Sequence, residues 1–589
     1  MFIGKIPHLR QSHGTLAVII PDRNRKQETT KKQTMTKIKT YLICLLISLT
    51  NVMLTNAQVK TTTKSKTADK VDKLLANYDF KNGPGLSLAV IKDGAIVYKK
   101  GFGIANLEYG NPITTSTVFQ VASVSKQFAV FSILLLEQEG KLSIEDDIRK
   151  YLPEMPDYGH KITLRNLANH TSGIRDNTDL AILIGTSESD LFSNEEAVKL
   201  ITSQKGLNFI PGDEFQYCNS GYILLAEIVK RVSGHSFAEF TQSRIFKPLK
   251  MKNSQFIDAP KTIIKNRAYS YDKFDNAYYK NILNHSFVGS TGLNTTTDDL
   301  SLWALNFEKK TIGNDAIFNK MKEKSRLNNG EIIPYGLGLE NQNYKGLDVI
   351  FHGGGIGKYG SRILVIPKHN FSVVYMCNSH EFHPFDIVYK IVDYYLANKE
   401  SIPSKPTINK ALLQNFVGDF GKFFEMVITF SRENDTLFLQ FKGDDNKVKL
   451  VQTSDNEFTY PNIPHSKFVF EKTNGQSSQF AKWHIADFSY KGQRIELKDF
   501  DKEKINKNEL VGMYYNAELN TNYNVIIKEN NLFATHSRNG EISLTPFQAD
   551  TFISNIGTIE LIRNDKKKVI GFNLSTQGIN KIKFDKINE

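Results

Sequence analysis

Residues 119–136 read Phe119-Gln-Val-Ala-Ser123-Val-Ser-Lys126-Gln-Phe-Ala-Val-Phe-Ser-Ile-Leu-Leu-Leu136. From Phe128 onward nearly every residue is apolar, and the helical pattern ends at Gly140. A helix that is apolar on all sides belongs in the core of a large protein. The stretch therefore predicts a buried helix that carries Ser123 and Lys126 at its amino end.

Ser123 and Lys126 form a Ser-x-x-Lys motif that suits nucleophilic catalysis. Residues three apart lie on one side of a helix, a few ångströms from each other. Burial disfavours an ammonium ion and lowers the pKa of a lysine, so its neutral amine can accept the serine proton near pH 7. The alternative is a capping serine beside a surface lysine. A second copy, Ser270-Tyr-Asp-Lys273, is followed by no apolar face and is not expected to form a site.

A tyrosine and an asparagine lie two residues apart in Gln216-Tyr217-Cys218-Asn219-Ser220-Gly221-Tyr222, just before a helix predicted over Ile223 to Val232. Residues i and i+2 of an extended segment point the same way. A hydroxyl and an amide so placed suit proton transfer and hydrogen bonding to a substrate. The alternative is a helix start, with Asn219 or Ser220 as the cap.

A glycine run follows a histidine in Phe351-His352-Gly353-Gly354-Gly355-Ile-Gly357, just before a strand predicted over Arg362 to Ile366. Glycine in a strand often marks the close approach of a ligand or another backbone. The run would let a substrate lie along the strand edge while His352 reaches its polar end. The alternative is a flexible surface loop with a solvated histidine.

The three motifs occur in the order Ser-x-x-Lys, Tyr-x-Asn, His-Gly-Gly, and in this order they resemble those of class C β-lactamases, D,D-peptidases and related esterases. The resemblance covers about residues 70–397. It extends to stretches that we interpret as scaffold, namely Leu164-Arg-Asn-Leu-Ala-Asn-His170-Thr-Ser-Gly-Ile, Gly289-Ser-Thr-Gly-Leu-Asn-Thr-Thr-Thr-Asp-Asp-Leu300 and Tyr335-Gly-Leu-Gly-Leu.

The resemblance implies a role for each matching residue. Ser123 would be the acylated nucleophile, and Lys126 and Tyr217 would share the general-base and general-acid work. Asn219 would orient the lysine and the substrate amide. The remaining implied positions are the substrate-binding residues His352, Gly353 and Gly354 and the oxyanion-hole N–H groups of Ser123 and Gly355. It implies no metal and no cofactor.

His352 departs from the β-lactamases of this resemblance, which usually carry a lysine at that position. A histidine is largely neutral at pH 7 unless its neighbours raise its pKa, so recognition of a penicillin carboxylate is put in doubt. His-Gly-Gly looks more like the esterases and D-stereospecific aminopeptidases, and the latter carry two β-barrel domains after the catalytic one. The implied activity is hydrolysis of D-amino-acid peptides or small esters. The alternatives are a β-lactamase and a non-catalytic binder of cell-wall peptides.

The order of elements predicts an α+β domain followed by an all-β region. Strands are expected at Leu86–Ile91 and Ala95–Tyr98, joined by Asp93-Gly94, and again at 362–366 and 371–377, with helices between. The resemblance makes this a β-lactamase/transpeptidase-like antiparallel sheet flanked by helices. Substrate specificity is expected to lie in loops such as Ile174 to Asn194.

Beyond Pro406 the chain consists of short alternating strands, and Leu413-Gln-Asn-Phe-Val-Gly and Glu509-Leu-Val-Gly each open a repeat. Closure into barrels is expected there, because it hides sheet edges, and the region resembles lipocalin-like domains in general shape; the pattern leaves open whether it forms one barrel or two. The alternative is two unrelated β segments. The full prediction is an upstream extension (1–34), a signal peptide (35–57), a polar lead-in (58–69), the hydrolase domain (70–398), a linker (399–408) and two β domains (409–505 and 506–589).

The amino-terminal charges explain much of the net charge of +13. Residues 1–57 hold nine Lys or Arg and two Asp or Glu, which gives +7 and leaves a mild surplus elsewhere. No basic stripe or zinc spacing accompanies it, so a nucleic-acid partner is not expected. A basic start at Met35, an apolar stretch from Tyr41 to Leu54 and the small residue Ala57 indicate export to the periplasm or beyond, with no stable membrane span after cleavage. The pattern leaves open whether the chain forms a homo-oligomer.

Overall fold

The fold is described from a computed structural model that covers residues 66–259, 261–382, 384–396, 408–423, 426–442, 444–461, 466–471, 475–485, 488–497, 500–501 and 504–587. The predicted extension 1–34, the signal peptide 35–57, most of the lead-in and all of the linker except residue 408 lie outside these residues. Contacts divide the chain into two units, 1–69 and 70–589, and the described part of the first is the start of α2 (Lys66–Leu75). Among the described residues, no helix has the length and apolar character needed to cross a membrane.

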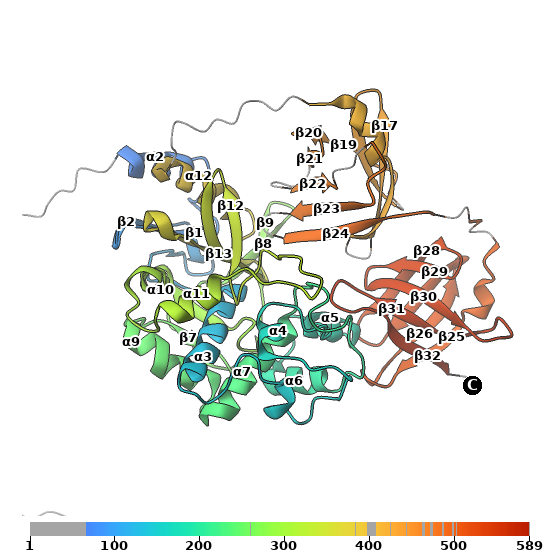
Figure 1. Cartoon of the computed structure of the whole chain (residues 1–589), viewed down its shortest axis with the longest axis horizontal. Coiled ribbons are helices and arrows are strands. Elements are labelled where there is room, and N and C mark those ends of the chain that lie inside the picture. Colours follow the sequence, from blue (N-terminus) through green and yellow to red (C-terminus); the bar gives the residue numbers. More distant parts are fainter. Residues whose placement is uncertain are drawn as a thin grey trace, which may run out of the picture. The chain divides into compact units, whose positions relative to one another are not determined.

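A six-stranded antiparallel sheet forms the frame of the first region (Figure 1). Its strand order is β12 (Glu340–Tyr344), β13 (Leu347–Ile356), β14 (Tyr359–Ile366), β15 (Phe371–Cys377), β1 (Leu86–Lys92) and β2 (Ala95–Phe102). Asp93 and Gly94 both have positive φ, as a tight two-residue hairpin requires. Because β1 pairs with β15, strands from the two ends of the region lie side by side in the sheet.

Helices fill the chain between β2 and β12. They are α3 (Lys126–Gln138), α4 (Leu164–Ala168), α5 (Asn177–Leu183), α6 (Asn194–Thr202), α7 (Asn219–Ser233), α8 (Phe237–Thr241), α9 (Lys247–Leu249), α10 (Thr297–Lys309) and α11 (Asp315–Lys322). α10 packs on β1 and β15, and α12 (Pro384–Leu396) packs on β14 and β15. Residues 126–136 of α3 are all buried, as expected from the nearly continuous run of apolar residues after Phe128. The predicted α+β arrangement is confirmed.

Short strands complete this region. They are β3 (Ile104–Asn106), β4 (Asn111–Pro112), β5 (Val118–Gln120), β6 (Phe192–Ser193), β7 (Gln255–Phe256), β8 (Ser270–Phe274), β9 (Ala277–Asn281), β10 (His285–Ser286) and β11 (Leu293–Thr296). The segment 174–194, expected as a loop, instead contains helix α5. The helix forms there because Leu180 and Leu183 are buried among the side chains of the C-terminal barrel, so tertiary packing stabilises a helix too short to persist alone.

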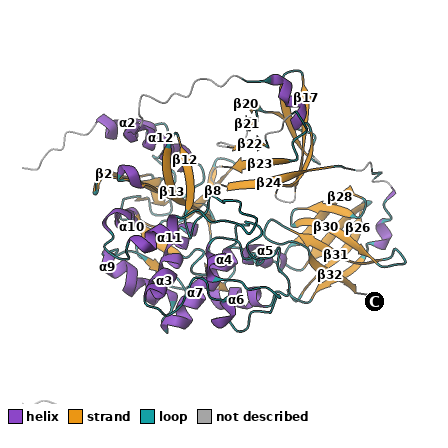
Figure 2. Cartoon of the chain, in the orientation of Figure 1, coloured by secondary structure: helices purple, strands orange, loops and turns teal. Residues whose placement is uncertain are grey.

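Apart from short 3-10 turns, the C-terminal region is built of strands, as predicted (Figure 2). A nine-stranded sheet comprises β16 (Gly418–Phe423), β17 (Met426–Glu433), β18 (Thr436–Phe441), β19 (Lys447–Lys449), β20 (Val451–Gln452), β21 (Glu457–Thr459), β22 (Ser466–Phe470), β23 (Phe480–Ile485) and β24 (Phe488–Ile495). A closed barrel follows, made of β25 (Gly512–Asn516), β26 (Thr521–Lys528), β27 (Asn531–His536), β28 (Gly540–Gln548), β29 (Thr551–Ser554), β30 (Gly557–Arg563), β31 (Val569–Ser575) and β32 (Ile582–Ile587).

The two predicted repeat openers have the same local structure. A 3-10 turn, Lys410–Phe416 in one and Lys507–Glu509 in the other, precedes the Val-Gly step in each. Gly418 and Gly512 then start a strand with φ of 137° and 133°. A residue with a side chain rarely adopts this conformation, which accounts for glycine at both positions. The two openers thus share one backbone conformation, while the repeat and its domain boundaries stay predictions.

Candidate active site

Ser123 lies in a strained turn at the entry to α3. A 3-10 turn, Ala122–Ser125, runs directly into the helix, and Ala122 has φ of +45° although it is not glycine. Such conformations cluster at functional sites, because the surrounding packing must hold them in place. Ser123 is half-buried, whereas Ala122, Val124 and Ser125 are buried. The turn therefore presents the Ser123 side chain and hides its neighbours.

Lys126 is fully buried and directs its amine at Ser123. Its Nζ donates hydrogen bonds to Ser123 Oγ at 3.0 Å, to Asn219 Oδ1 at 2.8 Å and to the Ser290 carbonyl oxygen at 3.0 Å. Burial lowers the pKa of Lys126 to about 7, against the opposing negative charge of Asp176. The geometry contradicts the alternative of a capping serine beside a surface lysine.

Tyr217 and Asn219 flank the same amine from the start of α7. The N-cap residue of α7 is Cys218, which makes no side-chain capping bond. Asn219 is the first residue of the helix, and its side chain accepts a hydrogen bond from Lys126 and does not cap the helix. The Tyr217 ring centroid lies 4.8 Å from Lys126 Nζ, and Tyr217 is hydrogen-bonded to Ser123. Burial raises the pKa of Tyr217 well above its usual value of 10, so its hydroxyl stays protonated at neutral pH.

His352 lies within strand β13 and is only 1% exposed. Its Nε2 lies 2.9 Å from the Tyr335 hydroxyl and its Nδ1 lies 2.6 Å from the Gly353 carbonyl oxygen. Burial, assisted by the charge of Lys126, lowers the pKa of His352 to about 3, so the imidazole is neutral at pH 7. The alternative of a flexible loop with a solvated histidine is contradicted.

The glycine run brings β13 against the turn Ala122–Ser125, which we call the Ser123 turn. A β-carbon on Gly354 would lie 2.9 Å from the backbone nitrogen of Ser123, and Ser361 Oγ on β14 donates to the Val121 carbonyl at 2.7 Å. β12 pairs with β13 only as far as Phe351, whereas β14 pairs with residues 350–356. Gly355 is exposed. This end of β13 thus borders Ser123 with one side unpaired by β12.

Several stretches that the sequence analysis treated as scaffold also touch the site. The His170 ring packs at a tilt against the Tyr217 ring, with the centroids 4.3 Å apart, and its Nδ1 accepts the Cys218 N–H. Ser290 binds Lys126 through its carbonyl oxygen, and Tyr335 contacts His352. His170, Ser290 and Tyr335 all lie in stretches that resemble the family, and this position is the sequence feature that could have marked them as site residues. Asp176, whose carboxylate accepts the Asn219 N–H, was missed, since nothing in its local sequence marks it.

Other candidate chemistry in the described part of the chain is absent or lies elsewhere. The second Ser-x-x-Lys lies on strand β8, where Lys273 pairs with Glu381 at the surface. Both cysteines in the described residues, Cys218 and Cys377, are free and buried. No group of three or more His, Cys, Asp or Glu among those residues is arranged to hold a metal ion.

A buried lysine hydrogen-bonded to a serine, with Tyr-x-Asn and a glycine-rich strand beside it, is the arrangement of a serine hydrolase-type fold. Comparison with known families agrees, since residues 71–393 match the family described as Beta-lactamase. The match spans more than half of the chain, which therefore belongs to the β-lactamase family. The resemblance inferred from the three motifs is confirmed.

Similar proteins carry two kinds of description. Penicillin-binding protein 4* of Bacillus subtilis is 29% identical over 62% of this chain and 85% of its own length. The D-aminopeptidase of Gluconobacter oxydans is 30% identical over 50% of this chain, and that of Brucella anthropi is 28% identical over 53%. The matched segments span only 56% and 59% of these two enzymes.

The solved structures support the fold alone. A penicillin-binding protein homologue from Pyrococcus abyssi, described as octameric, has a TM-score of 0.53 at 22% identity. The similarity covers 72% of this chain and 99% of that one. At this identity the likeness establishes the architecture and leaves the reaction to be argued from the site.

Proposed function

We propose that this protein is an exported serine hydrolase that cleaves amide or ester bonds through an acyl-enzyme on Ser123. The contact that carries the proposal is the 3.0 Å hydrogen bond between Lys126 Nζ and Ser123 Oγ. With a pKa of about 7, the amine is partly unprotonated at neutral pH and can accept the serine proton. Tyr217 keeps its proton under the same conditions, which favours Lys126 as the base.

The proposed reaction follows from these protonation states. Lys126 takes the proton of Ser123 Oγ, which forms a bond to the substrate carbonyl carbon. The backbone N–H groups of Ser123 and Gly355 hold the resulting oxyanion, and such a donor contributes roughly 3 kcal/mol. When the C–N or C–O bond breaks, Tyr217 donates its proton to the leaving group and regains one from the Lys126 ammonium. Water then releases the acyl group by the reverse sequence.

The proposed substrates are D-amino-acid peptides or amides, or small esters. Two observations support this class: relatives described as D-aminopeptidases, and a His352 side chain that is buried and neutral. A neutral imidazole supplies no cation for the carboxylate of a penicillin. Asn219 and the strand edge at Gly353 and Gly354 are proposed to hold the substrate backbone, with His352 beneath them.

Intact mass after incubation with a fluorophosphonate tests the nucleophile. We expect one adduct on the wild-type protein and none on Ser123→Ala. A D-alanine anilide and a chromogenic cephalosporin then separate the activities: anilide hydrolysis supports the proposal, and cephalosporin hydrolysis alone would identify a β-lactamase. A well-folded protein without any adduct would refute the hydrolase proposal and favour a non-catalytic peptide binder.

Export is part of the proposal and rests on residues 35–57, which lie outside the described residues. The expected mature product begins at Gln58 and is found in the periplasm or the medium. Intact mass of the purified protein, compared with that of the full chain, tests the cleavage site. Light scattering on the same sample measures whether the chain is a homo-oligomer.

A further inference from the structure

The turn between β31 and β32, residues 576–581, contacts the catalytic region beside its active site. We call these residues the docking turn. The Gly578 carbonyl oxygen accepts the Asp176 N–H at 2.9 Å and the Asn208 Nδ2–H at 2.9 Å. A β-carbon on Gly578 would overlap Asp176 and Asp179, so the turn fits closely against both residues.

The Asp176 carboxylate faces the active site from this contact. One oxygen accepts the Asn219 N–H, and the other accepts the Thr178 N–H at 2.8 Å. Asn219 in turn accepts a hydrogen bond from Lys126 through its side-chain oxygen. Asp176 therefore makes two contacts. Its backbone N–H binds the docking turn, and its side chain binds Asn219, the residue that accepts the hydrogen bond from Lys126.

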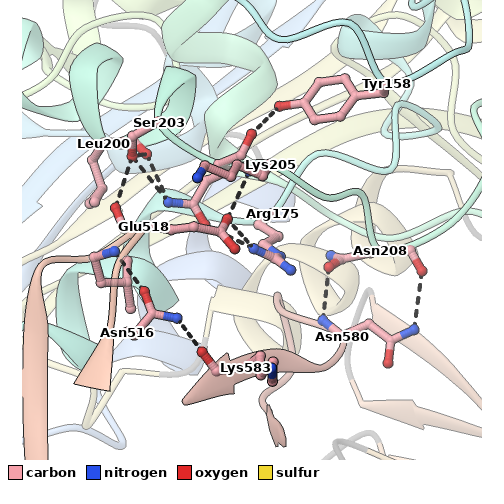
Figure 3. A network of polar contacts seen from close by, with 12 residues as sticks. Tyr158, Arg175, Leu200, Ser203, Lys205, Asn208, Asn516, Glu518, Asn580 and Lys583 are labelled. Carbon is pink, nitrogen blue, oxygen red and sulfur yellow. Dashed lines mark hydrogen bonds and ion pairs between the residues drawn. The ribbon is translucent and has the colours of Figure 1, made fainter. Parts of the chain in front are cut away.

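An ion pair next to Asp176 anchors the docking turn's barrel (Figure 3). The Arg175 side chain is 6% exposed, and its Nη1 lies 2.8 Å from Glu518 Oε2, which also accepts the Lys205 N–H. Asn580 makes two hydrogen bonds to Asn208. Both contacts join the barrel to residues adjoining the active site.

Helix α5, which follows Asp176, is itself packed on the barrel. Leu180 and Leu183 belong to the barrel's hydrophobic cluster. The carbonyl oxygens of Ile182 and Leu183 accept hydrogen bonds from Asn539 and Tyr523. The backbone on the carboxyl side of Asp176 is thus also held by contacts with the barrel.

We propose that Asp176 is a positioning residue that links the docked C-terminal barrel to Asn219 and, through Asn219, to Lys126. The inference rests on the proposed function, because it assigns Lys126 the role of base. It makes the last barrel a working part of the active site and not a separate module. Asp176 does not touch the substrate in this proposal; it sets the position and the charge environment of the amine.

The charge environment makes this role measurable. Asp176 and Glu340 face Lys126 with negative charge and raise the pKa of the amine against the effect of burial. Asp179 lies in the first turn of α5, against the same docking turn, and burial together with the charge of Asp176 raises its pKa to about 7. The other titratable groups around these residues are His170, His352, Tyr217, Tyr222, Cys218 and Arg175.

The first test is the pH dependence of fluorophosphonate labelling in Asp176→Asn. Asparagine keeps an acceptor for Asn219 but removes the charge, so the pKa of Lys126 falls. Labelling requires the neutral amine, and its acid limb should therefore move to lower pH by roughly one unit. Asp299→Asn is the matched control, because this buried carboxylate also accepts a backbone N–H, from Asn253, but is not among the charges that act on Lys126; it should leave the limb in place. An unshifted limb in Asp176→Asn would overturn the proposal, since a purely structural residue would change only the rate.

The second test acts from the barrel and leaves Asp176 intact. Gly578→Ala forces the docking turn away from Asp176, and we expect the labelling rate on the pH plateau to fall about 10- to 100-fold. Arg538→Ala is the control: it removes the barrel's surface ion pair with Asp190 and should stay within about twofold of wild type. Equal rates in Gly578→Ala and wild type would refute the link to the barrel. The outcome that would refute the proposed function is different: the wild-type protein itself would not be labelled.

Discussion

Gly354 and the backbone nitrogen of Ser123 are so close that a β-carbon on the glycine would lie 2.9 Å from that nitrogen. The same β-carbon would lie 2.4 Å from the Val121 carbonyl oxygen. Backbone atoms on both sides cannot rotate away as a flexible side chain can. Strand β13 and the Ser123 turn therefore fit together only with glycine at this position.

Gly354→Ala should consequently impair acylation of Ser123. Moving the turn by even about 1 Å can cost on the order of 100-fold in rate. Gly355→Ala, where a β-carbon meets nothing closer than 4.0 Å, keeps its backbone N–H and should lose far less. The labelling rates of the two variants provide the comparison, and equal losses would contradict the steric explanation.

Lys126→Arg should abolish labelling across the whole pH range. An arginine stays protonated at every accessible pH, so no base remains for the Ser123 hydroxyl. In the wild type the rate should rise as pH increases through about 7, because the lysine becomes active as it loses its proton. The measurement should extend roughly two pH units on each side of the pKa of Lys126. A wild-type labelling rate that does not change over this range would contradict Lys126 as the base.

The buried lysine should also leave a signature in stability. The unfolded chain binds a proton at Lys126 up to about pH 10.5, whereas the folded protein releases it near pH 7. Between these values the unfolded state binds more protons, so the lysine's contribution to the free energy of unfolding rises with pH. Relative to Lys126→Met, the wild type should gain a few kcal/mol from pH 7 to 10, measured by urea unfolding. A difference that does not change with pH would contradict the lowered pKa.

Tyr335→Phe should destabilise the protein by about 1–3 kcal/mol, because it leaves the buried Nε2 of His352 without its 2.9 Å partner. Tyr515→Phe is a matched control, since its hydroxyl bonds Asn520 at the surface, and should cost under about 0.5 kcal/mol. Thermal unfolding of both variants measures the difference. Similar midpoints would indicate that water replaces the tyrosine hydroxyl.

The sequence was sufficient for elements whose pattern is local. The hairpin at Asp93-Gly94, the buried helix after Ser123 and the two openers with Val-Gly each carry their signal within a few residues. The grouping of Ser123, Lys126, Tyr217 and Asn219 came from motif order and matches the structure's geometry.

Features made by distant contacts could not be predicted in the same way. Helix α5 is stabilised by leucines that fit into a barrel more than 300 residues later in the chain, and its own sequence cannot reveal that contact. Asp176 is positioned by hydrogen bonds to two residues that are distant in sequence, Asn219 and Gly578. His352 is buried by Tyr335 and its neighbours, which no pattern around the glycine run reveals.

The packing of α5 yields the last prediction. Leu183 is fully buried in the barrel's hydrophobic cluster, whereas Ile182 on the same helix is 44% exposed. Leu183→Ala leaves a cavity and should lower the free energy of unfolding by about 2–5 kcal/mol, whereas Ile182→Ala should cost under about 1 kcal/mol. Urea unfolding of the full chain measures both. If the two substitutions cost the same, Leu183 is not held by the barrel in solution, and the helix would then have to be stabilised by the catalytic region alone.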